Sequence, residues 1–327
     1  MRAFVITADG DTVTTTLESN YPSPPVDDVT VAIEWSGVNF KDSMVVNPKG
    51  KVRRSNRLVG GVDAAGIISA SSVAELRVGD RVVVHGGDLG VGRDGGFAES
   101  ISVPRDLVTS LPESLSTRDA MVVGTAGYTA FASLLALIEH GLRPEDGEVL
   151  VTGATGGVGA WSVAALAAAG YQVCASTGSA SSHGWLKDLG ATRIIGREEI
   201  GDKPERVLGS EIWAGAIDCV GGSTLHQILR TLKYGAGVAA SGLVASADLE
   251  TNVYPFITRN VALLGIDAVR ASKETKEKIW SLVASTMRGR DVEPLIDSVI
   301  GLEGIAEALA TIAKGQTQGR ILVNPRN

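Results

Sequence analysis

The sequence predicts an α/β protein with two domains: a β-rich domain and a domain built on a doubly wound parallel sheet. Short apolar runs bounded by Gly, Pro and Asp fill residues 1–115, as in antiparallel β structure. After residue 145, strand-like and helix-like segments alternate, which is typical of a parallel sheet with crossover helices. A glycine-rich turn at 153–159 lies where the second pattern begins.

The alternating part predicts a six-stranded parallel sheet. The helices expected between its strands lie at 157–169, 181–189 and 223–232. The strands are expected at 148–152, 171–176, 192–195, 214–219, 236–241 and 261–265.

The end of the chain predicts a discontinuous first domain. Helices are expected near 272–286 and 304–314, and residues 319–323 form a final strand-like run. A lone strand must pair with a sheet, and the amino-terminal β-rich part is the natural host. We therefore expect residues 1–118 and 268–327 to form one domain and residues 119–267 to form the other.

Composition limits the partners and the compartment. The chain has 327 residues, 44% of them hydrophobic, and a net charge of −7, so we expect no nucleic acid or membrane partner. No signal peptide and no apolar segment long enough to span a bilayer is apparent. Cys174 and Cys219 lie in strand-like runs, as buried reduced thiols do. The expected compartment is the cytoplasm.

The glycine-rich turn predicts a dinucleotide site. An apolar strand at 149–151 leads into the turn, and a run of small residues continues as a helix. Glycines let the backbone approach a pyrophosphate, and the helix N-terminus offers N–H donors and partial positive charge. The glycines are Gly153, Gly156, Gly157 and Gly159.

The same glycine spacing also fits the short-chain dehydrogenases, which need a Tyr-x-x-x-Lys pair downstream. The tyrosines Tyr171, Tyr234 and Tyr254 lack a lysine four residues later, so this alternative fails.

The end of the second expected strand favours NADPH over NAD. NAD enzymes usually place an acid there for the ribose hydroxyl, but the nearest acid is Asp188, well into the next helix. The hydroxyls of Ser176, Thr177 and Ser179 and the amide of Gly178 can donate to a 2′-phosphate, and Arg193 could add charge. Ordinary turn or capping chemistry is the alternative role of these hydroxyls.

A catalytic zinc is not expected, and we predict no metal. Zinc sites need Cys, His and carboxylate ligands, but residues 1–120 contain no cysteine and only one histidine, His85.

Several further segments together carry a family resemblance. They are Gly-Val-Asn-Phe-Lys-Asp at 37–42, Gly-Gly-Val-Asp-Ala-Ala-Gly at 60–66, Leu-Gly-Val-Gly-Arg-Asp-Gly-Gly at 89–96, Gly-Thr-Ala-Gly-Tyr-Thr-Ala at 124–130, Tyr-Pro-Phe-Ile-Thr-Arg-Asn at 254–260 and Gln-Gly-Arg at 318–320. With the turn at 151–159, the chain resembles the zinc-free quinone-oxidoreductase branch of the medium-chain dehydrogenase/reductase superfamily. Within that branch it is similar to the acrylyl-CoA-reductase-like (YhdH/YhfP) subfamily.

The resemblance implies a GroES-like catalytic domain, a Rossmann domain, NADPH, no metal and a homodimer. It also implies reduction of an activated carbon–carbon double bond. The cofactor contacts that it implies are Thr155, Gly156, Gly157, Val158, Thr177, Gly178, Ser179, Arg193, Leu243 and Ile257.

The resemblance also implies that residues 39–42 border the nicotinamide. The family usually has Tyr where this chain has Phe40, which cannot donate a hydrogen bond. Asn39 is then the first candidate to contact the substrate or the nicotinamide ribose. Asp42 is expected to orient neighbours such as Lys41, because a carboxylate would repel an enolate.

A basic segment suggests the substrate class. Its cations are Lys49, Lys51, Arg53, Arg54 and Arg57, and Arg53 and Arg54 are the candidates to hold the phosphates of an enoyl-CoA. A solvated loop is the alternative. An enone or a quinone is another possible acceptor, and one-electron quinone reduction or a non-catalytic NADPH sensor are alternative functions.

The apolar segment 260–267 is the expected dimer edge.

Overall fold

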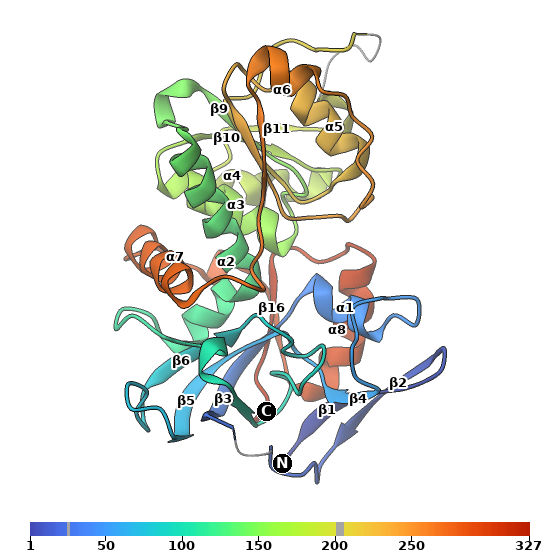
Figure 1. The fold of residues 1–327 in the computed structure, drawn as a ribbon, viewed down its shortest axis with the longest axis vertical. Coiled ribbons are helices and arrows are strands. Elements are labelled where there is room, and N and C mark those ends of the chain that lie inside the picture. Colours follow the sequence, from blue (N-terminus) through green and yellow to red (C-terminus); the bar gives the residue numbers. More distant parts are fainter. Residues whose placement is uncertain (25–26, 201–205) are drawn as a thin grey trace. The chain divides into compact units, whose positions relative to one another are not determined.

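The computed structural model describes residues 1–24, 27–200 and 206–327 (Figure 1). The chain forms two compact units. The first comprises Met1–Ala126, Ala268–Ala284 and Arg290–Asn327, and the second Gly127–Asp267 and Ser285–Gly289. The sequence placed the first division at 118/119, whereas this division falls after residue 126, inside helix α2 (Thr117–His140).

Two sheets build the first unit. A seven-stranded sheet has the order β15-β16-β3-β5-β6-β8, with β7 also paired to β3, and a three-stranded sheet has the order β2-β1-β4. The helices of this unit include α1 (Phe40–Val46), α7 (Lys273–Thr286) and α8 (Ile305–Ala313). The strands are β1 (Ala3–Asp9), β2 (Thr12–Glu18), β3 (Val29–Val38), β4 (Arg57–Val59), β5 (Asp63–Ser71), β6 (Arg81–His85), β7 (Ser100–Val103), β8 (Val108–Ser110), β15 (Ile296–Ile300) and β16 (Arg320–Val323).

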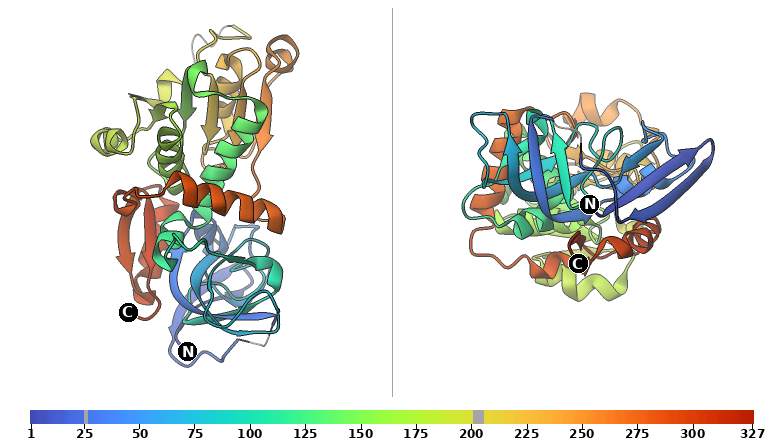
Figure 2. Two further views of the ribbon diagram at one scale, coloured as in Figure 1. Left: turned by 90° about the vertical axis from the view of Figure 1, so that its left-hand side faces the viewer. Right: turned by 90° about the horizontal axis from the view of Figure 1, so that it is seen from below.

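The final strand pairs with the amino-terminal sheet, which confirms the prediction from the sequence. β16 lies antiparallel to β3, with Ile321 opposite Val38. Figure 2 shows the red carboxyl-terminal strands next to the blue amino-terminal ones. β15 adds a further strand, parallel to β16, that the sequence analysis did not anticipate.

The second unit contains the predicted six-stranded parallel sheet, in the order β11-β10-β9-β12-β13-β14. Its buried strands carry the apolar runs that predicted them, and helices α3 (Gly157–Ala168), α4 (His183–Asp188) and α5 (Gly222–Thr231) lie at the expected places. The strands are β9 (Glu148–Val151), β10 (Gln172–Ser176), β11 (Arg193–Ile195), β12 (Gly215–Asp218), β13 (Gly237–Ala240) and β14 (Ala262–Gly265). The short α6 (Tyr254–Arg259) was not anticipated.

Helix α2 corrects one expectation from the sequence. Its length and composition would allow it to cross a membrane, although no sufficiently long apolar segment was expected. However, 72% of its most apolar window is buried in the protein, as is common for core helices. The helix also breaks at Gly124, where the backbone has φ 51° and ψ −161°.

Candidate functional site

The glycine-rich turn has the geometry of an anion site. Gly156 N donates to Gly153 O over 3.0 Å, and no side chain caps the amino end of α3. A Cβ on Gly159 would lie 2.2 Å from Gly153 O, so the helix packs against the turn only because this residue is glycine. Thr155, Gly157 and Val158 lie in the turn and the first helical turn, as the sequence predicts. The first N–H groups of α3 are therefore available to a pyrophosphate.

Asp218 supports this turn from the neighbouring strand and was missed by the sequence analysis. The hydroxyl of Thr152 donates to Asp218 Oδ1 over 2.6 Å, and Gly221 N donates to Oδ2 over 2.8 Å. Burial raises the pKa of Asp218, while these hydrogen bonds oppose the shift. β9 and β12 pair where the strand order reverses, which is the usual ligand-binding position of this fold. An acid at the carboxyl end of a buried strand was the available signal.

The hydroxyls after β10 differ in what they can reach. Ser176 is buried, and its hydroxyl points to Gly196 O, 3.5 Å away. Thr177 is buried as well and accepts a bond from Ser179 N over 3.0 Å. Gly178 is exposed and Ser179 is half-buried. The Gly178 amide and Ser179 are thus the groups best placed to meet a phosphate, while Ser176 faces the protein.

Arg193 lies at the wrong edge of the sheet for the predicted phosphate contact. Its Nε and Nη2 donate to the two carboxylate oxygens of Glu148, at 2.9 and 2.7 Å. Its guanidinium carbon also lies 5.3 Å from the centre of the Trp213 ring. Glu148 begins β9 at the amino edge of the sheet and holds the guanidinium of Arg193 there, although the Arg193 backbone lies level with Cys174 in β10. The glycine turn follows the carboxyl edge.

Arg197 is the cation that lies beside the predicted ribose site. A Cβ built on Gly178 would be 2.9 Å from Arg197 Nε and 3.1 Å from Nη2. Arg197 is exposed and lies two residues after the end of β11, at the carboxyl edge. The expected phosphate ligands follow the second strand of the sheet, whereas this arginine follows the third.

The two apolar side chains that were predicted to contact the cofactor are Leu243 and Ile257, and they belong to different segments. Leu243 follows β13 at the carboxyl edge and is 48% exposed. Ile257 lies on α6, whose last residue, Arg259, accepts a bond from Gly235 N just before β13 begins. The carboxyl end of α6 therefore lies toward the amino edge of the sheet, and the contact of Ile257 with the cofactor stays a prediction.

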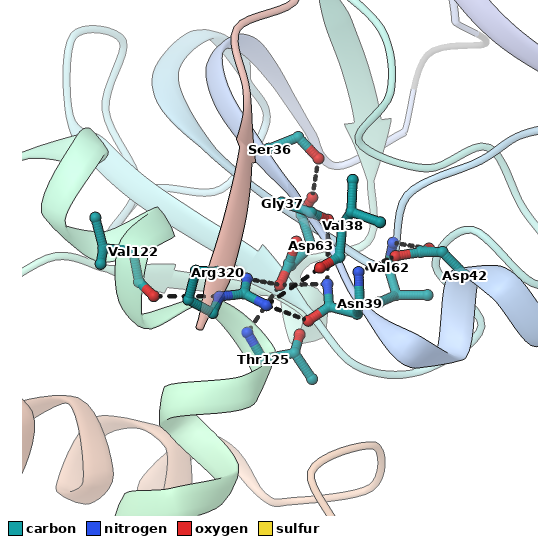
Figure 3. A network of polar contacts seen from close by, with 10 residues as sticks. All are labelled: Ser36, Gly37, Val38, Asn39, Asp42, Val62, Asp63, Val122, Thr125 and Arg320. Carbon is teal, nitrogen blue, oxygen red and sulfur yellow. Dashed lines mark hydrogen bonds and ion pairs between the residues drawn. The ribbon is translucent and has the colours of Figure 1, made fainter. Parts of the chain in front are cut away.

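The first unit places Asn39 in a buried polar network (Figure 3). Its Nδ2 donates to Gly37 O over 3.1 Å and to Asp63 Oδ2 over 3.0 Å. Its Oδ1 accepts from Arg320 Nη1 over 2.9 Å. Both amide hydrogens are used inside the protein, so Asn39 can meet a substrate only as an acceptor.

Asp42 holds backbone groups on both sides of this network. Its Oδ2 accepts from Asn39 N over 2.8 Å and its Oδ1 from Val62 N over 3.0 Å. Burial, together with the nearby Asp63 carboxylate, raises the pKa of Asp42 to about 7. The side chain thus orients the start of α1 and the segment before β5, in addition to any effect on Lys41.

Phe40 opens onto an apolar groove of about 460 Å³ formed by β2, α1 and α8. Phe40 is 36% exposed there. The groove is lined by Thr15, Phe40, Ser43, Met44, Val46, Asn47, Pro48, Ala306, Leu309, Ala310 and Ala313.

The basic segment adjoins one end of this groove, but its cations are not equivalent. Arg53 Nη1 donates to Val45 O near the end of α1 over 3.0 Å, and Arg57 pairs with Glu18 at 2.7 Å. Lys49 lies on a turn fixed by a 2.9 Å bond from its N–H to Asn47 Oδ1. Lys49, Lys51 and Arg54 are exposed. Of the two predicted phosphate ligands, Arg54 is exposed to solvent, whereas Arg53 already donates one hydrogen bond to the backbone.

Metal ligands do not gather in any described part of the chain: residues 1–24, 27–200 and 206–327 contain no group of three or more His, Cys, Asp or Glu suited to a metal ion. His85 is buried and accepts a hydrogen bond from Trp280 Nε1 at 3.2 Å, and burial lowers its pKa to about 3.

Known proteins match the chain over nearly its whole length. Residues 25–113 match the family described as alcohol dehydrogenase GroES-like domain, and residues 157–285 match zinc-binding dehydrogenase. Acrylyl-CoA reductase AcuI of Ruegeria pomeroyi is 44% identical over 302 residues, covering 92% of this chain and 91% of the relative.

Solved structures agree with this match. The yhdH oxidoreductase of Salmonella enterica, in complex with NADP, has a TM-score of 0.95 at 38% identity and covers 99% of both chains. The yhfP protein of Bacillus subtilis, with NAD bound, has a TM-score of 0.95 at 39% identity and covers 99% of this chain and 98% of that one. The chain belongs to the zinc-free acrylyl-CoA-reductase-like (YhdH/YhfP) subfamily of the medium-chain dehydrogenase/reductase superfamily.

Proposed function

We propose that this protein is an NADPH-dependent reductase that adds hydride to an activated carbon–carbon double bond without a metal. The observation that carries the proposal is the anion site at the carboxyl edge of the parallel sheet, with Arg197 beside Gly178. The NADP-bound Salmonella relative and the acrylyl-CoA reductase of Ruegeria support it.

The residues around this edge fit NADPH. The uncapped amino end of α3 suits the pyrophosphate, and Arg197, Ser179 and the Gly178 amide suit a 2′-phosphate. No carboxylate follows β10 directly to repel that phosphate. Once bound, NADPH supplies the hydride.

The substrate side is proposed to be the 39–42 segment. Hydride addition at the β-carbon of an enone or enoyl thioester leaves an enolate that needs a proton at its α-carbon. Phe40 has no hydroxyl, and both amide hydrogens of Asn39 are engaged. We therefore assign the proton to solvent, with Asn39 and Asp42 fixing the shape of the segment.

An acyl-CoA is the acceptor that the first unit suits best. The apolar groove beside Phe40 could take the thioester arm, and the exposed cations Lys49, Lys51 and Arg54 could hold its phosphates. A quinone remains the second candidate, because Phe40 gives the groove an aromatic wall without a proton donor. We also propose a cytoplasmic homodimer with no nucleic acid or membrane partner.

One experiment separates these functions. NADPH oxidation is followed by absorbance with acrylyl-CoA, crotonyl-CoA and 1,4-benzoquinone as acceptors. Turnover of the thioesters in deuterated water, with one deuterium incorporated at the α-carbon, is the expected result. Turnover of the quinone alone would favour quinone reduction. Tight NADPH binding without turnover of any acceptor would favour a sensor.

A further inference from the structure

A buried ion pair lies directly behind Asn39. Arg320 begins β16, and its Nη2 lies 3.6 Å from Oδ2 of Asp63, which begins β5. The side chains of Arg320 and Asp63 are 2% and 0% exposed. The register explains why the two meet: β16 and β5 both pair with β3, opposite Val38 and Ser36 respectively. Asn39, directly after β3, therefore lies between them (Figure 3).

This pair fixes the orientation of the Asn39 carboxamide. A guanidinium only donates hydrogen bonds and an ionised carboxylate only accepts them. The carboxamide can therefore bond to both neighbours in only one orientation, with Oδ1 toward Arg320 and Nδ2 toward Asp63. A flipped carboxamide would place two donors together at Arg320 and two acceptors together at Asp63.

The surrounding backbone is shaped to hold the guanidinium. A Cβ on Gly37 would lie 2.6 Å from Arg320 Nη2, and a Cβ on Gly124 would lie 2.4 Å from it. Arg320 Nε donates to Val122 O over 3.2 Å, and Thr125 N donates to Asp63 Oδ2 over 2.8 Å. The break in α2 at Gly124 thus contributes a backbone donor and a backbone acceptor to the pair.

We propose that Arg320 and Asp63 are positioning residues, which hold the Asn39 carboxamide so that only a lone pair of its oxygen remains for a ligand. This inference rests on the proposed reductase function, in which Asn39 fixes the shape of the 39–42 segment. Buried ion pairs contribute little to stability, since well-packed apolar residues often replace them without lowering the free energy of unfolding. In this protein the pair makes the orientation of one side chain unique.

Two conservative variants and one matched control test the proposal. Asp63→Asn keeps the shape but lets the carboxamide face either way, and Arg320→Lys shortens the reach to Asn39. The control is Lys276→Met, which removes another buried cation of the same unit, one that donates to His85 O and Asp106 O. All three variants should unfold at lower temperature than the wild type.

The network variants are expected to change kcat but not the affinity for NADPH. Both network variants should lower kcat by about 100-fold, as small misplacements do, with an unchanged NADPH Kd. Lys276→Met should retain wild-type kcat. Equal kcat for the control and the network variants, measured well below their unfolding temperatures, would overturn the proposal.

A readout independent of turnover distinguishes failure of this inference from failure of the proposed function. The side-chain NH2 group of Asn39 should exchange slowly with solvent in the wild type and in Lys276→Met, as followed by nitrogen-edited NMR. It should exchange at least about 10-fold faster in Asp63→Asn and Arg320→Lys, because an engaged amide is protected. Equal exchange in all four proteins would refute the positioning role whether or not any acceptor is reduced.

Discussion

Thr152 and Asp218 join two strands that are neighbours in the sheet but distant in the sequence, through a hydroxyl-to-carboxylate bond of 2.6 Å. Cys219 N also donates to Thr152 Oγ1 over 3.1 Å, so two hydrogen bonds connect the ends of the strands. Together they fix the carboxyl ends of β9 and β12, next to the glycine turn that follows β9. Loss of these hydrogen bonds should affect both stability and cofactor binding.

We predict that Asp218→Ala lowers the free energy of unfolding by about 1–3 kcal/mol, because it leaves the Thr152 hydroxyl and Gly221 N–H buried without their acceptor. It should also weaken NADPH binding, since the turn loses its support. Urea titration and fluorescence titration with NADPH measure the two effects. Thr152→Val removes the bond to Asp218 and the bond from Cys219 N, but it leaves the carboxylate its backbone donors Val220 N and Gly221 N. It should have the smaller effect, and the opposite ranking would contradict this account.

Arg197 should decide the preference for NADPH. Removing a charge-assisted contact costs about 1.5–3 kcal/mol, so Arg197→Ala should raise the NADPH Kd by about 10- to 100-fold and leave the NADH Kd nearly unchanged. The matched control is Arg193→Ala, which should leave both constants unchanged because its guanidinium is held by Glu148 at the other edge. A loss of NADPH affinity in the Arg193 variant alone would restore the original sequence prediction.

Asp42 should make stability depend on pH. The pKa of its carboxyl is raised to about 7, first by burial and then by Asp63, with opposing contributions from two backbone N–H donors and Arg320. The folded protein therefore binds a proton that the unfolded chain releases near pH 4. Its stabilising contribution is complete below about pH 4 and is lost as the pH rises through 7.

Unfolding in urea between pH 5 and 8 tests this dependence against Asp42→Asn, which cannot ionise. The stability of the wild type relative to the variant should fall as the pH rises. A relative stability that stays constant between pH 5 and 8 would mean that the bonds from Asn39 N and Val62 N keep the carboxylate ionised.

The sequence predicted the features that depend on local pattern. Apolar runs located all the strands of the parallel sheet, and the orphan strand at 319–323 correctly implied a host in the amino-terminal sheet. The glycine spacing located the turn before α3, because a turn is read from consecutive residues.

The features that depend on sheet register were not predictable in this way. Arg193 and Arg197 are four residues apart, yet Arg193 begins the three-residue strand β11 and pairs with Glu148, whereas Arg197 follows the carboxyl end of that strand. Asn39, Asp63 and Arg320 come from three segments, and only the pairing of β16 and β5 with β3 brings them together. No single-sequence pattern contains that pairing, so the sequence named Asn39 without revealing that its amide hydrogens are engaged.

The edge strand β14 should control the oligomeric state. It pairs only with β13 within the described chain, so its outer backbone groups can pair with a second copy. Leu263 on this strand is 39% exposed. Leu263→Lys should convert a dimer to a monomer in analytical ultracentrifugation, because a charge on an edge strand opposes pairing. Tyr234→Lys introduces the same charge at a 71% exposed aromatic side chain outside any strand and should remain dimeric. A wild-type protein that sediments as a monomer at all concentrations, or a dimer that withstands Leu263→Lys, would show that β14 does not form the interface.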